Sequence, residues 1–500
     1  MSIEISPYET IENRQFGIHE KIIIDDSIFD SIEFRDGKIT FSFENCFFRT
    51  LYIENRTNID FKDISILFSY CYIENIYVEQ IESENISVLF TNSIISGKID
   101  NKNLGLVSIY NCLMNDSLFL MKLKKVDISY GETTINPSKW RKFLRQFSLS
   151  INDYKENRFY VYEFEKLTFY SEEDTTNKFG VFKENYKNYD YNKIRFRFTD
   201  QEKAEFKISL KLIYNPKIDD ESTRILNSKF HSLEVSGTAS GEVQIENCDI
   251  DNIYLHNFST KESCNFYNIR PFRNSSDRKF EIKRSNLDKF WFDNVLFNSY
   301  QLISLYRNKI SQTIFSSCEF PVNYKDFEKF IVVENIHYPE KKDYNYNKLR
   351  YETLLQLKKT LENSGNFQES LKFQSVANES LLKIENISNW DKVILSINSF
   401  SNDHGVSIKK PLIALFISSI FLYILYLISL NKIFIFKDSI DWKLFGYYFS
   451  FLDITHRTDF LASKKEGLNG FSLMIDYINK IILGFFIYQF IASFRKYGKK

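Results

Sequence analysis

The hexapeptide FENCFF, residues 43–48, decides how the first two thirds of this 500-residue chain are organised. In it, an apolar residue is followed by two residues, a Cys, one more residue and a second apolar residue. The same arrangement, with Cys or Ser at the fourth position, returns along the chain, which indicates an internal repeat. Its nine copies start at residues 24, 43, 68, 90, 109, 225, 245, 282 and 315.

Successive copies lie about 19–25 residues apart wherever the run is unbroken, and further apolar residues follow most copies at five-residue steps. This length suits one turn of a coil with several short faces. A parallel solenoid accounts for the motif, because a small Cys or Ser and a large apolar residue then point inward and stack on their counterparts in adjacent turns. An antiparallel β domain with alternating strands is the alternative.

The motif resembles a degenerate pentapeptide repeat, in which a small residue precedes the central Phe or Leu by two. That resemblance implies a right-handed, four-sided β-helix. Only one or two faces per turn keep the pattern, and the usual Ala and Asn/Asp-Leu signature is blurred, so widened or irregular turns are expected. The predicted fold class is therefore mainly β: a degenerate right-handed parallel β-solenoid with a β insertion, followed by an α-helical hairpin and two C-terminal transmembrane helices.

Two segments break the repeat. The first, residues 136–149, predicts a basic amphipathic helix that either rests on an anionic membrane or packs on the side of the solenoid, and we expect the packed arrangement. The second, residues 151–218, is rich in Tyr, Phe and Lys, and its alternating stretches KIRFRF and EFKISLKLIY predict a hairpin. We expect this second segment to be a β insertion. The apolar face of the helix carries Trp140, Phe143, Leu144 and Phe147.

A basic segment lies at residues 270–284, RPFRNSSDRKFEIKR. It has six positive side chains against only Asp277 and Glu281, and such a loop can bind phosphate, a polyanion or another partner. A solvated loop without a ligand is the alternative. The predicted binding residues are Arg270, Arg273, Arg278, Lys279, Lys283 and Arg284.

The period changes to helical between residues 344 and 385. Gly365 is a helix stop, and Asn366 with Glu369 forms a capping box, so we expect an antiparallel helical hairpin. The stretch YETLLQLKKTLENSGNFQES is similar to the hairpin that precedes the membrane region in bacterial pentapeptide-repeat membrane proteins. It also resembles one tetratricopeptide unit, and we expect it to cap the solenoid.

The stretch PLIALFISSIFLYILYLISL, residues 411–430, carries no charge and is flanked by Lys409, Lys410 and Lys432. It predicts a membrane-spanning helix. A second span is predicted at residues 471–494, where Asp476 and Lys480 lie four apart and can pair. The tail RKYGKK favours a cytosolic C-terminus, and the N-terminus lacks a secretion signal. We therefore expect a multi-pass protein of the cell inner (cytoplasmic) membrane with a cytosolic N-terminal domain.

The segment between the spans contains WKLFGYYFSFLDITHRTDF, residues 442–460. Together with the spans it resembles the two-helix, ion-channel-like module fused to some bacterial pentapeptide-repeat proteins. It lacks a TVGYG filter, so potassium selectivity does not follow from the resemblance. Asp453, His456 and Asp459 are the possible pore-mouth residues, and ordinary loop polarity is the alternative explanation for them.

Charge and motifs exclude several function classes. Lys plus Arg equals Asp plus Glu at 65 each, so no specific nucleic-acid binding is predicted. The six cysteines are scattered without a CxxC pair, and no P-loop, GxGxxG, HExxH or GxSxG sequence occurs. We therefore expect no catalytic site, no metal and no cofactor.

Two functions remain open. In the first, the membrane helices tether a cytosolic solenoid that binds or senses an unknown protein or other macromolecule. In the second, a homo-oligomer forms an ion-conducting pore that the solenoid gates. The first is favoured because no filter sequence is present. The predicted divisions are solenoid 1–138, helix plus β insertion 139–220, solenoid 221–343, helical hairpin neck 344–388, amphipathic linker 389–410 and membrane module 411–500.

Overall fold

The structure is a computed structural model of the full chain, which divides into two compact units, residues 1–343 and residues 344–500. The structure describes residues 2–3, 9–17, 20–24, 38–55, 63–79, 86–101, 104–131, 137–154, 156–172, 195–197, 203–205, 207–271, 278–322, 324–430, 442–458 and 469–498.

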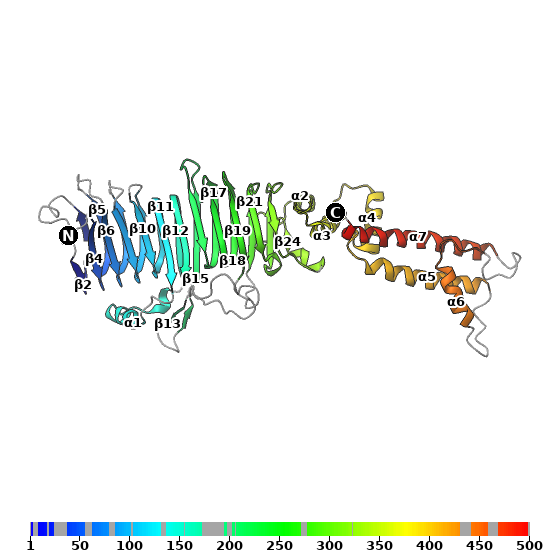
Figure 1. The fold of residues 1–500 in the computed structure, drawn as a ribbon, viewed down its shortest axis with the longest axis horizontal. Coiled ribbons are helices and arrows are strands. Elements are labelled where there is room, and N and C mark those ends of the chain that lie inside the picture. The colour runs from blue at the N-terminus through cyan, green and yellow to red at the C-terminus, as the bar shows by residue number, and fades with distance from the viewer. Residues whose placement is uncertain are drawn as a thin grey trace. The chain divides into compact units, whose positions relative to one another are not determined.

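The first unit is a parallel β-solenoid, which confirms the predicted coil and shows that the antiparallel alternative is wrong (Figure 1). Each strand pairs with its counterpart in the next turn. The strands of the coil are β1 (Ser2–Ile3), β2 (Thr10–Glu12), β3 (Glu20–Ile24), β4 (Lys38–Glu44), β5 (Phe47–Asn55), β6 (Asp63–Ser69), β7 (Tyr72–Glu79), β8 (Ile86–Thr91), β9 (Ile94–Asp100), β10 (Leu106–Tyr110), β11 (Leu113–Gly131), β12 (Glu156–Glu172), β15 (Lys207–Tyr214), β16 (Ser222–Leu226), β17 (Lys229–Ala239), β18 (Val243–Thr260), β19 (Cys264–Arg270), β20 (Lys279–Lys283), β21 (Phe290–Val295), β22 (Leu302–Tyr306), β23 (Ile314–Ser316) and β24 (Phe330–Ile331).

The register of the coil places like residues on like residues. Ile64 pairs with Ile86, and Val107 pairs with Val126 in the next turn. Phe68 stacks on Phe90 with ring centroids 5.3 Å apart. Such ladders bury identical apolar side chains in a continuous core, which is how a repeat too small to fold alone becomes stable.

The Cys or Ser of the motif lies just inside a corner of the coil. The Ser93 hydroxyl donates a hydrogen bond to the carbonyl oxygen of Thr91 at 2.9 Å, and the Cys248 thiol donates to that of Glu246 at 3.1 Å. A small donor is needed here because buried carbonyl groups must be paired. Burial raises the pKa of the Cys112 thiol to about 12, which fits the expected role of these cysteines as core residues.

The residue before each of these small side chains turns the corner in the left-handed backbone region, with φ near +50°. Asn tolerates this conformation better than other non-glycine residues, and it is the most frequent residue at this position. The first copy of the motif, at residues 24–29, lies almost entirely outside the described residues. The described corner residues are Asn45, Tyr70, Asn92, Asn111, Asn227, Asn247, Arg284 and Ser317.

The first interruption is a helix packed on the solenoid, as predicted. In α1 (Pro137–Gln146) the fully buried Trp140 and Phe143 join a cluster with Tyr70, Tyr72 and Leu113 of the coil. Since its apolar face is covered by the solenoid, the alternative in which this face rests on a membrane is not supported.

The second interruption is shorter than the sequence predicts. Within the expected β insertion, β12 and β15 are parallel strands of the coil, and Phe159 pairs with both Leu118 and Leu210. This turn lacks the Cys or Ser of the motif; the buried Asn157 instead accepts a hydrogen bond from the Met114 amide at 2.7 Å. A short antiparallel pair, β13 (Arg195–Arg197) and β14 (Lys203–Glu205), is present, but the predicted second arm of the hairpin, EFKISLKLIY, instead supplies the coil strand β15.

The second unit is helical. Asn366 accepts a hydrogen bond from the Glu369 amide at the start of α3, and Gly365 adopts φ +79° at the turn before it, which confirms the predicted hairpin of α2 and α3. In the same unit α5 and α7 run side by side (Figure 1). The helices are α2 (Tyr346–Asn363), α3 (Phe367–Leu382), α4 (Asn389–Asn402), α5 (Lys409–Ser429), α6 (Trp442–Phe451) and α7 (Gly470–Gly498).

Candidate functional site

The basic segment of the solenoid is largely paired with carboxylates. The Arg270 guanidinium lies 2.7 Å from an oxygen of Asp249. Glu334 lies 2.6 Å from Arg284 and 3.8 Å from Lys283, so one carboxylate serves both cations. A bound anion would have to compete with these carboxylates, and the anion-binding role therefore stays a prediction.

The remaining residues of the basic segment are placed differently. The ammonium group of Lys279 lies 3.2 Å from Nδ1 of His337, and Lys279 and Lys283 are the two ends of β20. Arg278 precedes that strand, and Arg273 lies outside the described residues. The segment is therefore partly a strand of the coil rather than the single loop that the sequence predicts.

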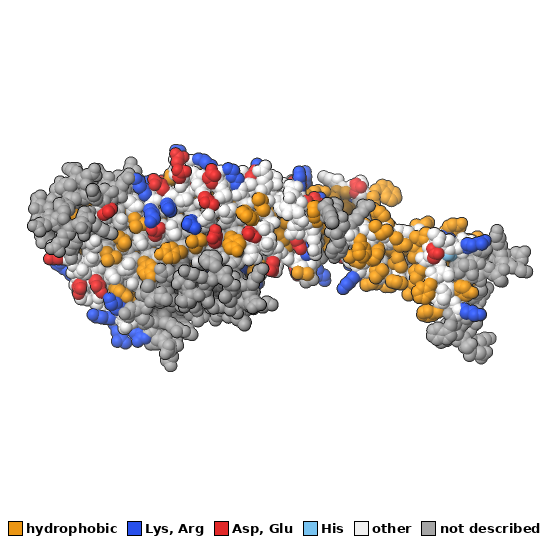
Figure 2. Space-filling view, in the orientation of Figure 1, with side chains coloured by type: hydrophobic (Ala, Val, Ile, Leu, Met, Phe, Trp, Pro, Cys, Tyr) orange, Lys and Arg blue, Asp and Glu red, His pale blue; other side chains and the backbone are white. Residues whose placement is uncertain are grey.

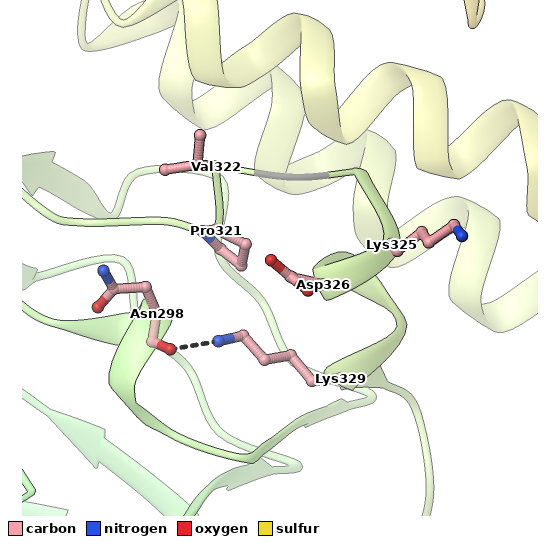
Figure 3. A pocket seen from close by; sticks show the side chains of 6 residues that line it. All are labelled: Asn298, Pro321, Val322, Lys325, Asp326 and Lys329. Atoms are coloured by element: carbon pink, nitrogen blue, oxygen red, sulfur yellow. Dashed lines mark hydrogen bonds between the residues drawn. The ribbon is translucent and has the colours of Figure 1, made fainter.

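A cavity of about 560 Å³ opens at the C-terminal end of the solenoid (Figure 3). Lys329 donates a hydrogen bond to the carbonyl oxygen of Asn298 at 2.6 Å, while Lys325 extends away from the cavity. Burial lowers the pKa of Lys329 to about 8, so part of this amine is neutral near neutral pH. Pro321, Val322 and Asp326 complete the described lining, which has no Cys, His or Ser.

A buried ionic cluster joins α7 to the segment that follows α6. Oδ1 of Asp476 is 2.5 Å from Nε2 of His456, and Oδ2 of Asp476 is 3.4 Å from Nζ of Lys480. The latter pair confirms the predicted contact across one helical turn. Asp476 is fully buried, and Lys480 also donates to the carbonyl oxygen of His456 at 2.8 Å.

The segment after α6 is held by this cluster and by further polar contacts. Asn479 donates to the carbonyl oxygen of Phe451 at 2.9 Å, and Nδ1 of His456 contacts the carbonyl oxygen of Asp453. Hydrogen bonds from Thr455 lower the pKa of the Asp453 carboxyl, which lies at the surface. His456 is therefore buried where the segment after α6 contacts α7, and Asp453 lies at the edge of this contact.

These placements bear on the three predicted pore-mouth residues. Asp459 lies outside the described residues. His456 serves a structural contact with α7, and a role at a pore mouth stays a prediction for all three. The sequence did not indicate that His456 contacts Asp476; the only available signal was an acidic residue inside an otherwise apolar helix, which requires a partner.

The helices α5 and α7 are long and apolar enough to cross a membrane, with mean hydropathy of 2.4 for an 18-residue stretch within residues 409–429 and 1.5 for one within residues 470–494. Their polar side chains face inward: the Ser419 and Tyr448 hydroxyls are 2.8 Å apart, and Ser472 is fully buried. Their outward side chains are apolar, and Ile417 and Ile481 are 65% and 72% exposed. Figure 2 shows this apolar surface over α5 and α7.

Several buried apolar residues join the two apolar helices to α6. Tyr426 and Phe451 are fully buried, with ring centroids 5.4 Å apart. Ile475 of α7 packs in the same cluster. The two apolar helices and α6 therefore share one buried apolar cluster.

Comparisons with known proteins do not extend this description. No protein-family model, curated protein or solved structure matches the chain. Among the described residues, no group of three or more His, Cys, Asp or Glu side chains is arranged to hold a metal ion.

Proposed function

We propose that this chain is an integral membrane protein that tethers a β-solenoid, and that the solenoid is a non-enzymatic binding or sensing platform for a macromolecular partner. The observation that carries the proposal is the inverted polarity of α5 and α7. Their buried polar side chains contact α6, whereas their apolar side chains face outward. Such helices are stable where the surroundings are lipid.

The dimensions of the helices agree with a bilayer. The 21 residues of α5 extend about 30 Å, which is the thickness of a hydrocarbon core. Asn469 at the start of α7 donates to the carbonyl oxygen of Ser429 at the end of α5, and Ser493 donates to that of Ser407 before α5. The two helices therefore run antiparallel over their full length, as a membrane hairpin requires.

The proposed topology follows from the charges at one end of this hairpin. Lys409 and Lys410 are the first two residues of α5, and the RKYGKK sequence at residues 495–500 follows the second span. Positive residues concentrate on the cytosolic side of membrane proteins. We propose that the solenoid and the C-terminus lie in the cytosol and that the membrane is the bacterial inner membrane.

The solenoid offers a partner long faces with regular side-chain ladders. One exposed apolar group lies on adjacent turns, where Trp291 pairs with Ile314 and both side chains are nearly half exposed. Tyr267 of the preceding turn is also exposed. Aromatic residues with accessible apolar area are common in the centres of protein interfaces, so this group is the first surface to test for a partner.

The competing function is an oligomeric ion-conducting pore gated by the solenoid. A water-filled path requires polar side chains on the surfaces that face the pore. On the described parts of α5 and α7, the exposed surface is predominantly apolar, and the polar side chains of Ser419 and Asn479 are engaged with α6. This distribution favours tethering over conduction.

Carbonate extraction of membranes that contain the full chain tests the proposal. The wild-type chain should stay in the membrane pellet, whereas the double variant Ile417→Arg/Phe421→Arg should be released, because each central Arg costs about 3 kcal/mol of insertion. Val322→Arg, at an exposed position of the solenoid, is the matched control and should stay in the pellet. Release of the wild-type chain would refute membrane integration.

Oligomeric state in mild detergent, followed by conductance in planar bilayers, separates tethering from conduction. A monomer without conductance is expected. A ring with single-channel currents would overturn the tethering proposal in favour of the pore.

A further inference from the structure

Helix α4 has an exposed apolar face in the part of the second unit that precedes the first span. Trp390 and Phe400 are each 79% exposed, and Ile394 is 55% exposed. Together with Val393 and Ile397 they recur at helical spacing along one side of the helix. Contiguous exposed apolar surface of this kind marks a site that another apolar surface covers.

The opposite, polar side of α4 faces the protein. Asn398 accepts a hydrogen bond from the Gln489 side chain of α7 at 3.2 Å, and Asn402 donates to the same Gln489. Asn402 is almost completely buried. An amphipathic helix at the surface of a soluble protein has the reverse orientation, because water then favours polar residues outside.

The position of α4 is continuous with the membrane hairpin. A short turn leads from Asn402 to the start of α5, and Lys410 pairs with Asp403 in this turn. The contacts with Gln489 hold α4 beside the final turns of α7 within the second candidate span. The charged residues of α4 are Asp391 and Lys392, both in its first turn.

We propose that α4 is an interfacial helix that lies on the membrane, with the face of Trp390, Val393, Ile394, Ile397 and Phe400 inserted at the boundary between headgroups and acyl chains. Amphipathic helices bind lipid in this way, and Trp is enriched at that depth. This inference rests on the proposed membrane insertion of α5 and α7. It adds a second, peripheral contact with the lipid of the same bilayer leaflet.

Site-directed spin labelling of the full chain in phospholipid vesicles tests the inference. One variant, Ile397→Cys, places the label at the centre of the apolar face. Its matched control, Ser396→Cys, places it on the neighbouring exposed polar position, and Ile417→Cys reports on the exposed middle of α5. All three use a Cys318→Ser background, because Cys318 is the only described cysteine that is not buried.

The accessibility of each label to oxygen and to a water-soluble nickel chelate decides the outcome. Oxygen should dominate at Ile397→Cys and nickel at Ser396→Cys, with the depth at Ile397→Cys shallower than at Ile417→Cys. A label at Ile397→Cys that is open to nickel, or that is shielded from both reagents by a second copy or another protein, would overturn the inference. If the Ile417→Cys label itself is open to nickel, the proposed membrane insertion fails first.

Discussion

Replacing Glu221 with Gln should stabilise the solenoid at pH 8 and leave its stability almost unchanged at pH 4. Glu221 is fully buried in the coil, and among the described residues no group donates a hydrogen bond to its Oε2 atom. Burial raises the pKa of this carboxyl to about 7 from its ordinary value of 4.5, with a smaller contribution from the negative charge of Glu163. A buried carboxylate without full hydrogen bonding disfavours its charged form.

The magnitude follows from the difference between the two pKa values. One pKa unit corresponds to about 1.4 kcal/mol, so the interval from 4.5 to about 7 corresponds to about 3 kcal/mol. Between these pH values the native state keeps the proton and the unfolded chain releases it. The unfolded state then binds fewer protons, and the free energy of unfolding falls as the pH rises, until both states are ionised above about pH 7.

The Glu221→Gln variant keeps the existing contact of this side chain, because its amide oxygen can still accept the hydrogen bond that the Asn215 amide donates to Glu221 at 3.2 Å. The variant remains neutral at every pH, so it avoids the cost of ionisation. Denaturant unfolding of the purified protein in mild detergent, followed by the circular dichroism of the β-structure, measures the difference at pH 4, 6 and 8. Glu262→Gln, at an exposed position of the same unit, is the control.

The stability gain of Glu221→Gln should grow from pH 4 to pH 8 and approach about 3 kcal/mol, while Glu262→Gln should show no such trend. A gain that is independent of pH would mean that Glu221 does not ionise on unfolding in this range. A loss of stability at pH 8 would show that the carboxylate has a favourable partner, and both results would refute the electrostatic reasoning.

Three further sets of substitutions test the corner motif, the packed helix and the ionic cluster. Cys248→Ser should change the free energy of unfolding by less than about 1 kcal/mol, because the hydroxyl can still donate a hydrogen bond to the carbonyl oxygen of Glu246. Cys248→Ala loses this hydrogen bond and should cost about 1–2 kcal/mol. Equal losses for the two variants in denaturant unfolding would contradict the role of the corner residue as a hydrogen-bond donor. Trp140→Ala should cost about 3–5 kcal/mol and speed proteolysis of α1, and unchanged protection from protease would show that α1 does not depend on this contact. Asp476→Ala should lower the free energy of unfolding in detergent by about 3 kcal/mol, because Lys480 loses its carboxylate partner. Adding Lys480→Ala to the same chain should restore part of this stability. Additive losses of the two variants in thermal unfolding would argue against the ion pair.

The sequence by itself determined the repetitive part of the fold. A Cys or Ser between two large apolar residues recurs at the length of one solenoid turn, and the side chains that form this pattern are the ones that meet in the core. The two apolar helices could likewise be predicted from the sequence, since length and hydropathy are local properties. The capping residue Asn366 and the turn residue Gly365 likewise act over a few residues.

The tertiary structure alone decided which irregular segments join the coil and which polar groups meet. The turn that contains β12 lacks the Cys or Ser of the motif, so only its pairing with β11 and β15 in the neighbouring turns reveals it. The contact of His456 with Asp476, and the outward orientation of the apolar face of α4, depend on how separate helices pack. Local periodicity specifies which face of an element is apolar, but it does not specify which surface that face meets, because that choice is made by contacts between residues far apart in the chain.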